Sequence, residues 1–550
     1  MGVVSMTRRC SWLVLTSLAA GPLPALAETI APQVPGLVNP NLQREQIEQI
    51  QQQRRIEERA RRTQVPALRG EEPEDQRLPE GGERFVLSGI GFNASEYLPR
   101  EQLEAMARHY VGREIGFDDL NRLLRAINEL YEARGQLTAR ALIPAQDLEG
   151  GQLRIVLVEA KVDQVSWKGG PRRVDDAFYD RRLHVEPGTT LDSPALMNAI
   201  QRFNATTPGP QVTASLAPGA RFGTTAVELE AFEPDSLQWS LFANNYGNEG
   251  TGREQYGGSL TWFSPTGAAD ALNLLLVATS GSQYGSVRYS RPVNRWNGVA
   301  YGEVGGNSMT VEEGPLASLN IEGESRTWTL GFDQPWWLDE HWVLQGGVGY
   351  NQQRSENTIE GFTLSEVDTR EGFLRGQVEY RSAPWYLRYE QRVRQAQVDN
   401  AVSGDGGSYG LLNGQGYLSR ALGEQYELVG RFGWQFASDT QALPASLFYQ
   451  FGGISSVRGY DPGVISSPQG ATLNLEAWWR PSERWQPFVF FDYGRAMELG
   501  IADIDLQSVG VGLNFNWGRH LSLSLVAANT LKDVVPDQDS GQVLAQIVLR

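Results

Sequence analysis

The chain has 550 residues, a formal net charge of -17 and a single cysteine, Cys10. This length exceeds that of one ordinary domain, so several domains are expected. The negative charge argues against nucleic acid as a partner. Cys10 falls within residues 1–27, which are expected to be removed, so the mature chain would have no thiol; this excludes a disulfide-stapled secreted scaffold and cysteine-based metal or redox chemistry.

Residues 1–27 have the composition of a secretory signal peptide. Arg8 and Arg9 form a positive start, an apolar run from Trp12 to Leu23 follows, and Ala25-Leu26-Ala27 supplies the small residues that a signal peptidase needs. A membrane anchor is the alternative, but the run is too short to span a bilayer. Beyond it there is no run of about 18 apolar residues, so an exported chain that crosses a membrane would need a closed barrel.

The next segment, residues 28–63, is polar. Within it, residues 41–63 contain neither glycine nor proline and are rich in Gln, Glu and Arg, which predicts one helix with Asn41 near its N-cap. The helix has no strong apolar face, so we expect it to be exposed to solvent or to lie in a polar cavity. Residues 64–83 are predicted to be a flexible linker.

Two stretches, residues 84–160 and 161–234, show the same predicted order of strand, helix, helix, strand and strand. In the first, the second helix carries Leu120, Leu123, Leu124, Ile127 and Leu130. Repetition of a unit of about 75 residues indicates two copies of one small α+β module.

The last part, residues 235–550, contains 13 of the 15 tryptophans. Strand-like segments alternate there with turns, and apolar residues alternate with small or polar ones, as from Ser508 to Trp517. This pattern is typical of a transmembrane β-barrel whose apolar side chains face lipid. A soluble β-sandwich also alternates, but apolar faces that end in aromatics such as Trp517 and Trp479 favour the barrel.

Sixteen antiparallel strands are predicted in the barrel, an even number as is usual for such barrels. They cover 236–246, 255–264, 270–279, 282–290, 296–305, 323–332, 341–350, 371–381, 384–395, 410–420, 425–437, 472–480, 485–495, 508–517, 519–528 and 542–550.

The gap at about 440–470 is too long for a hairpin turn, and such a loop usually has a function. In the strand at 485–495 the even positions face the lumen, so Asp492 points inward and needs a cationic partner. Arg458 is a candidate if the loop folds inward. Glu476 and Arg480 on the neighbouring strand face the same side and compete for either pairing.

These features resemble the two-partner secretion transporters, the TpsB family of ShlB/FhaC/HecB-like haemolysin secretion/activation proteins within the outer-membrane insertase superfamily. The matching motifs are Val457-Arg458-Gly459-Tyr460 in the loop and Phe490-x-Asp492-x-Gly494 in the strand. The resemblance implies a plug helix at 41–63, two POTRA modules and a sixteen-stranded barrel. It also implies that the two motifs meet through Arg458 and Asp492. The ending Val548-Leu549-Arg550 departs from the aromatic terminus common in such barrels.

The resemblance implies an outer-membrane transporter whose POTRA modules, in the periplasm, recognise an unfolded exoprotein such as an adhesin or haemolysin. The exoprotein then leaves through the barrel. There is no nucleotide-binding motif, so export without nucleotide hydrolysis and without a cofactor is expected. An insertase that assembles other barrels is the main alternative. An enzyme is disfavoured because no catalytic motif or metal-ligand cluster occurs and the four histidines are scattered. A porin would not need the modules.

Overall fold

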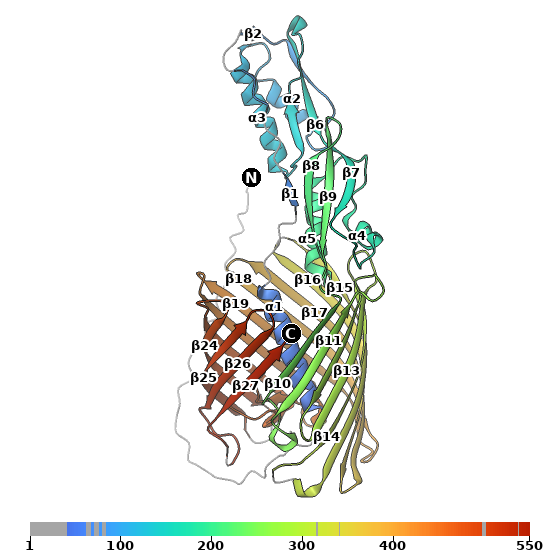
Figure 1. Cartoon of the computed structure of the whole chain (residues 1–550), viewed down its shortest axis with the longest axis vertical. Helices are drawn as coiled ribbons and strands as arrows, with labels where there is room; N and C mark the ends of the chain where they lie inside the picture. Colours follow the sequence, from blue (N-terminus) through green and yellow to red (C-terminus); the bar gives the residue numbers. More distant parts are fainter. Residues whose placement is uncertain are drawn as a thin grey trace, which may run out of the picture. The chain divides into compact units, whose positions relative to one another are not determined.

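In the computed structural model of the chain, the described residues are 41–61, 68–70, 76–79, 84–314, 317–339, 341–497, 502–536 and 538–550. The signal peptide predicted at 1–27, and the rest of the chain before residue 41, lie outside them. Figure 1 shows two small α+β modules followed by a barrel. None of the helices in the described ranges combines the length and the apolar character needed to cross a membrane.

The first helix, α1 (Leu42–Arg61), lies inside the barrel (Figure 1). Its apolar residues are few, and they pack at separate points of the barrel wall. Ile56 joins a cluster with Tyr246 and Val526, and Ile47 packs with Leu275. The helix predicted from the lack of glycine and proline is therefore present, and of the two environments expected for it, the polar cavity is the one observed.

The first module packs two helices on a small sheet whose strand order is β3-β6-β5, and a second pair, β2-β4, lies beside it. Of the apolar helix residues named from the sequence, Leu120, Leu123, Leu124 and Ile127 lie in its core and are nearly inaccessible to solvent, and Leu130 is partly buried against it. The elements are β2 (Phe85–Val86), β3 (Gly89–Phe92), α2 (Arg100–Ala107), β4 (Glu114–Ile115), α3 (Phe117–Ala133), β5 (Ala139–Leu142), η1 (Glu149–Gly151) and β6 (Gln152–Glu159).

The second module repeats this plan with β7 (Lys161–Lys168), α4 (Asp176–Leu183), α5 (Ser193–Thr206), β8 (Gln211–Pro218) and β9 (Thr224–Phe232). Its sheet has a fourth strand, β1 (Leu68–Gly70), which pairs in parallel with β8. The prediction of a flexible linker at 64–83 is therefore wrong for these three residues. Three residues are too few to show an alternating pattern in the sequence. Only the pairing with β8 identifies this segment as a strand.

The barrel is closed and has sixteen antiparallel strands, each paired with its neighbour in sequence, and β10 pairs with β27. The strands are β10 (Leu237–Asn244), β11 (Gln255–Phe263), β12 (Ala271–Ala278), β13 (Ser282–Pro292), β14 (Val299–Thr310), β15 (Ile321–Leu338), β16 (Trp342–Ile359), β17 (Phe362–Ser382), β18 (Trp385–Asn400), β19 (Gly406–Leu422), β20 (Tyr426–Ala437), β23 (Gln469–Trp479), β24 (Trp485–Met497), β25 (Ile504–Trp517), β26 (Leu521–Thr530) and β27 (Gly541–Leu549). The predicted count is confirmed.

Several predicted strands were too short. The strand predicted at 371–381, for example, is β17, of 21 residues. About ten residues suffice to cross the hydrocarbon core. Beyond it the strand continues, but lipid no longer imposes an apolar face, so the alternation that marked the strand fades before the strand ends.

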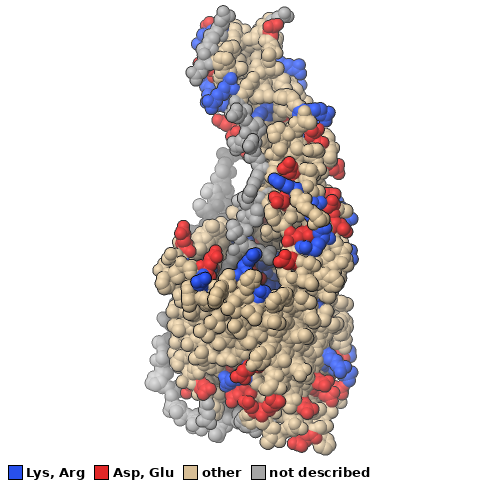
Figure 2. All heavy atoms as spheres, in the orientation of Figure 1, with Lys and Arg blue, Asp and Glu red and all other residues tan. Residues whose placement is uncertain are grey.

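The lipid-facing side of the barrel is apolar, as predicted from the alternation. Val511, Trp517 and Trp479 have exposed fractions of 56%, 64% and 47%, whereas Ser508 on the opposite face is fully buried. In Figure 2 the middle of the visible barrel wall is largely free of charged side chains, which gather above and below this band. Such a band matches the hydrocarbon layer of a membrane.

Candidate functional site

The segment between β20 and β23 folds into the barrel and is called the inward loop here, residues 438–468. It contains a short hairpin of β21 (Tyr449–Phe451) and β22 (Ile465–Ser467), preceded by a turn of helix, η4 (Ala445–Leu447). On β20, Gln435 donates hydrogen bonds to the carbonyls of Leu447 (2.8 Å) and Pro468 (3.1 Å), so both limbs of the loop are held at the barrel wall.

Arg458 and Asp492 meet inside the barrel. Arg458 Nε and Nη2 donate to the two oxygens of the Asp492 carboxylate at 2.7 and 2.6 Å, and the backbone amide of Arg458 donates to the same group at 3.1 Å. The Arg458 guanidinium also lies over the ring of Phe490, 3.7 Å from its centroid. This paired, two-point geometry is the one in which a guanidinium–carboxylate interaction is strongest.

A second ion pair extends this site, and the four charged residues are called the Arg458 cluster here. Glu476 on β23 accepts from Arg458 Nη1 at 2.7 Å and from Arg431 on β20. Arg458, Asp492 and Glu476 are each no more than 5% exposed. Two cations thus face two anions. Such balance is required because an unpaired buried charge costs several kcal/mol.

The small and aromatic residues of the two motifs explain how the inward loop comes so close to the wall. A Cβ at Gly494 would lie 2.8 Å from Val457 and 3.1 Å from Phe451, so glycine makes room for the loop. Gly459 has φ of +91°, a left-handed conformation that favours glycine. The Tyr460 hydroxyl donates to the carbonyl of Lys532 (2.6 Å), lies 3.0 Å from the carbonyl of Gln507 and accepts from the Gln507 amide (3.1 Å), which ties the end of the motif to the wall.

Of the two residues expected to compete for these pairings, Glu476 joins the cluster and Arg480 does not. Arg480 forms an ion pair with Glu427. Sequence reasoning missed Arg431 and the role of Trp478, which donates to Glu476 at 2.9 Å and stacks on Phe488 with 4.1 Å between ring centroids. A signal was present for Trp478, because it is the one large apolar residue on the polar face of its strand. Arg431 had none.

The helix α1 is held in the lumen by scattered polar contacts. Glu57 forms an ion pair with Arg431 of the Arg458 cluster (3.1 Å), and Arg59 pairs with Glu379 (3.3 Å). Other contacts reach strands and the inward loop: Gln46 to the carbonyl of Tyr246 (2.7 Å), Arg44 to Gln353 (2.8 Å) and Gln53 to the carbonyl of Ser455 (3.2 Å). Contacts of this kind can be exchanged for water at little cost.

The second module contacts the barrel through Arg182 of α4. Its side chain donates to the Asn297 side chain and to the carbonyl of Asn294, both at 2.7 Å, and Asn297 in turn donates to Thr206 of α5. No carboxylate is among these partners. Burial therefore lowers the pKa of Arg182 to about 10, and the nearby charge of Arg181 acts in the same direction.

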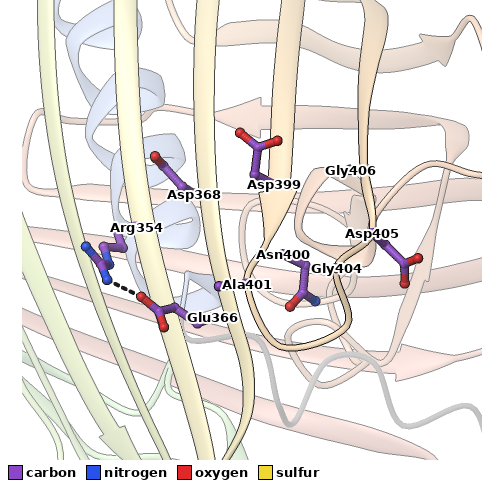
Figure 3. A pocket seen from close by; sticks show the side chains of 9 residues that line it. All are labelled: Arg354, Glu366, Asp368, Asp399, Asn400, Ala401, Gly404, Asp405 and Gly406. Carbon is purple, nitrogen blue, oxygen red and sulfur yellow. Dashed lines mark hydrogen bonds and ion pairs between the residues drawn. The ribbon is translucent and has the colours of Figure 1, made fainter.

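A shallow acidic hollow lies where β16, β17, β18 and β19 end (Figure 3). Within it, Arg354 forms an ion pair with Glu366. Within the described part of the chain, no group of three or more His, Cys, Asp or Glu side chains could hold a metal ion. The hollow is lined by Arg354, Glu366, Asp368, Asp399, Asn400, Ala401, Gly404, Asp405 and Gly406.

Two family models match the chain. A POTRA domain of ShlB type matches residues 85–160, and the haemolysin secretion/activation protein model ShlB/FhaC/HecB matches residues 223–515, more than half of the chain. The chain is 22% identical over 475 residues to a haem/hemopexin transporter protein, HuxB, of Haemophilus influenzae, covering 80% of this chain and 82% of that protein. It is 24% identical over 431 residues to the outer membrane transporter CdiB of Dickeya dadantii, with coverage of 73% and 74%.

The fold is similar to that of a solved structure, CdiB from Escherichia coli. The TM-score is 0.67 at 18% sequence identity, and the match covers 95% of this chain and all of the solved one.

Proposed function

The chain belongs to the ShlB/FhaC/HecB family of haemolysin secretion/activation proteins, which are outer-membrane transporters of two-partner secretion, and we propose that it exports one dedicated TpsA-like exoprotein. The barrel lies in the outer membrane and the POTRA modules lie in the periplasm. The exoprotein arrives unfolded in the periplasm, binds the modules and crosses through the lumen.

The observation that supports this proposal best is the placement of α1. A 20-residue helix occupies the lumen and is bound mainly through single ion pairs and amide hydrogen bonds. A permanent filler would bury a continuous apolar face. A helix held by exchangeable contacts suits a plug that closes the pore at rest and leaves it during export.

The Arg458 cluster has a different role in this proposal. Its charges are paired and, except for that of Arg431, buried, so the inward loop is firmly held while α1 is not. We assign to the loop the task of fixing the shape of the lumen, and through Arg431 and Glu57 it also contacts the plug. Neither role requires a cofactor or bond-making chemistry, so the proposed activity is transport without catalysis. Folding of the exoprotein outside the cell would supply the driving force.

Comparative proteomics of a deletion strain tests the proposal, with culture supernatant and outer membrane analysed separately. Loss of one large exoprotein from the supernatant, with other outer-membrane barrels unchanged, is the expected result. Broad depletion of barrels from the outer membrane would instead indicate an insertase. An unchanged supernatant would contradict dedicated export. Complementation with the intact gene is the control.

A further inference from the structure

Three neighbouring strands of the barrel, β15, β16 and β17, extend past the lipid-facing band. β10 begins at Leu237, just after the second module ends at Phe232, so the first residue of β10 lies at the periplasmic end. Because the strands alternate in direction, β15 and β17 begin at the extracellular end and β16 ends there. The three strands have 18, 18 and 21 residues, whereas about ten cross the hydrocarbon core. Their outer segments therefore stand at the level of the lipid headgroups and above.

On the outer face of each of these strands, the first charged residue beyond the apolar band is an arginine: Arg326 on β15, Arg354 on β16 and Arg370 on β17. Trp328 and Tyr350 pack together at the edge of the band, with 5.2 Å between their ring centroids. Aromatic residues mark the boundary between hydrocarbon and headgroups. Arg326 lies two residues beyond Trp328, and Arg354 lies four beyond Tyr350, which is about 7–13 Å along a strand. This is the depth at which lipid phosphates lie.

The three arginines are close neighbours on the sheet. Arg326 and Arg354 are register partners, so they stand side by side on adjacent strands and share one face. Arg370 is the register partner of Gln352, which places it diagonally beside Arg354. Like charges directly opposite one another destabilise a sheet. An anion bound between the guanidinium groups would remove this repulsion.

The carboxylates near these arginines leave donors for a further anion. The ion pairs are Arg326–Glu324 (3.8 Å), Arg354–Glu366, Arg370–Asp368 (2.7 Å) and Arg370–Asp399 (3.8 Å). A guanidinium has five N–H donors, and a carboxylate occupies only some of them. The side chains of Arg326, Arg354 and Arg370 are 85%, 70% and 45% exposed. Their remaining donors are therefore accessible to a phosphate, which a guanidinium binds through two N–H groups.

The acidic hollow adjoins the arginines on the side away from the membrane. Arg354, Asp368 and Asp399 form one register row across β16, β17 and β18, and all three line the hollow (Figure 3). Asp368 lies two residues farther out than Arg370 on the same strand. Carboxylates accept hydrogen bonds from hydroxyl groups. Groups that bind phosphate thus lie next to the hydrocarbon band, and groups that bind hydroxyls lie beyond them. This order matches a phosphorylated glycolipid whose acyl chains are in the membrane and whose sugars are outside it.

We propose that the outer face of β15–β17 binds lipopolysaccharide, the phosphorylated glycolipid of the outer leaflet, with Arg326, Arg354 and Arg370 holding a phosphate. The sugar hydroxyls bind the acidic hollow. An acyl chain lies against Trp328 and Leu374, which are 39% and 62% exposed. The inference requires only that the barrel lies in the outer membrane. It goes beyond the proposed function, and its failure would leave the export of an exoprotein untouched.

Binding of fluorescently labelled lipopolysaccharide to the purified full-length transporter in detergent tests the proposal. The triple variant Arg326→Gln, Arg354→Gln and Arg370→Gln should bind at least tenfold more weakly than the unmodified protein. Replacement of the same three residues by lysine should cause a smaller loss, because lysine still binds phosphate as a point charge. Unchanged binding by the glutamine variant would overturn the proposal.

The matched control removes outward-facing arginines at the other end of the barrel. Arg291 of β13 and Arg420 of β19 are exposed and lie at the periplasmic end, where the outer leaflet does not reach. The double variant Arg291→Gln and Arg420→Gln should bind lipopolysaccharide as the unmodified protein does. An equal loss in this control would overturn the proposal, since binding would then follow the overall charge and not the site. All variants change exposed side chains, so the heat-modifiable gel mobility of the folded barrel should be the same in each.

Changes to the lipid separate the parts of the proposal. Lipopolysaccharide from which the phosphates have been removed should bind at least tenfold more weakly, and equal binding would overturn the assignment of the arginines. An excess of phosphatidylglycerol should not displace the labelled lipopolysaccharide. Displacement by this simple anionic lipid would overturn the choice of a glycolipid.

A last variant examines the acidic hollow. Asp399→Ala with Asp405→Ala removes two of the carboxylates that line it. Binding of lipopolysaccharide should weaken severalfold, because acceptors for the sugar hydroxyls are lost. Tighter binding would show that these carboxylates only repel the phosphate, and it would overturn the assignment of the sugars to the hollow.

Discussion

The backbone amide and the side chain of Arg458 both bind the carboxylate of Asp492, so one lumen-facing acid holds the inward loop at two points. The pair is buried, and Glu476 binds the remaining side of the guanidinium. Removal of either partner would leave an uncompensated charge inside the barrel.

We predict that Arg458→Ala and Asp492→Ala each reduce secretion more than tenfold while the barrel still assembles. Breaking a buried ion pair costs about 3–5 kcal/mol, which would release the loop but leave the strand ladder of the wall in place. Arg458→Lys should also impair secretion, because an ammonium group cannot make the two-point contact. Secretion assays and the amount of protein in the outer membrane are the measurements.

Arg495→Ala is the matched control, since Arg495 lies on the same strand as Asp492 and pairs at the surface with Asp503 (2.7 Å). Surface pairs contribute about 0–1 kcal/mol, so this variant should secrete normally. Near-normal export by both the Arg458 and the Asp492 variants would show that the Arg458 cluster is not needed for export.

Gly494→Ala should displace the inward loop. The added Cβ would collide with Val457 and crowd Phe451, and overpacking of this kind costs about 1–3 kcal/mol. We expect a severalfold loss of secretion with normal assembly. Gly372→Ala on β17 is the control, because nothing lies within 4 Å of a Cβ there. Equal secretion by the two variants would show that the close approach of the inward loop to Gly494 is not needed for secretion.

The combined change Glu57→Ala and Arg59→Ala should make the plug leave more often. Each residue loses one partly exposed ion pair with the wall, to Arg431 and to Glu379, and each pair contributes at most about 1 kcal/mol. Channel openings in planar bilayers should therefore become severalfold more frequent. Glu48→Ala, which removes a pair within α1 itself, should leave the frequency unchanged. A closed channel in the double variant would argue against these pairs as the plug's hold.

Arg182→Ala should loosen the second module from the barrel. The variant loses hydrogen bonds to Asn297 and to the Asn294 carbonyl, and hydrogen bonds to a charged group contribute about 1.5–3 kcal/mol. Limited proteolysis should then separate the modules from the barrel faster than in the unmodified protein. The exposed neighbour Arg181 is the control: Arg181→Ala should be cleaved at the unmodified rate. Identical cleavage of all three proteins would mean that this joint is held elsewhere.

The sequence by itself determined the sixteen strands of the barrel and the face that each presents to lipid. Alternation is a local property, imposed on each strand by the membrane on one side and the lumen on the other. The alternation was sufficient to predict that Asp492 and Glu476 face the lumen. The resemblance of the two motifs to those of a known family indicated Arg458 as the partner of Asp492. The helix at the N-terminus followed from composition alone.

Only the tertiary structure decided which lumenal charges meet and what the linker does. Arg431 and Arg480 are both arginines near the same wall, yet the first joins Glu476 and the second Glu427. Their partners depend on strand register, and many registers fit one alternating pattern. The strand at Leu68–Gly70 had no local signal at all, because its hydrogen bonds come from β8, almost 150 residues away in sequence.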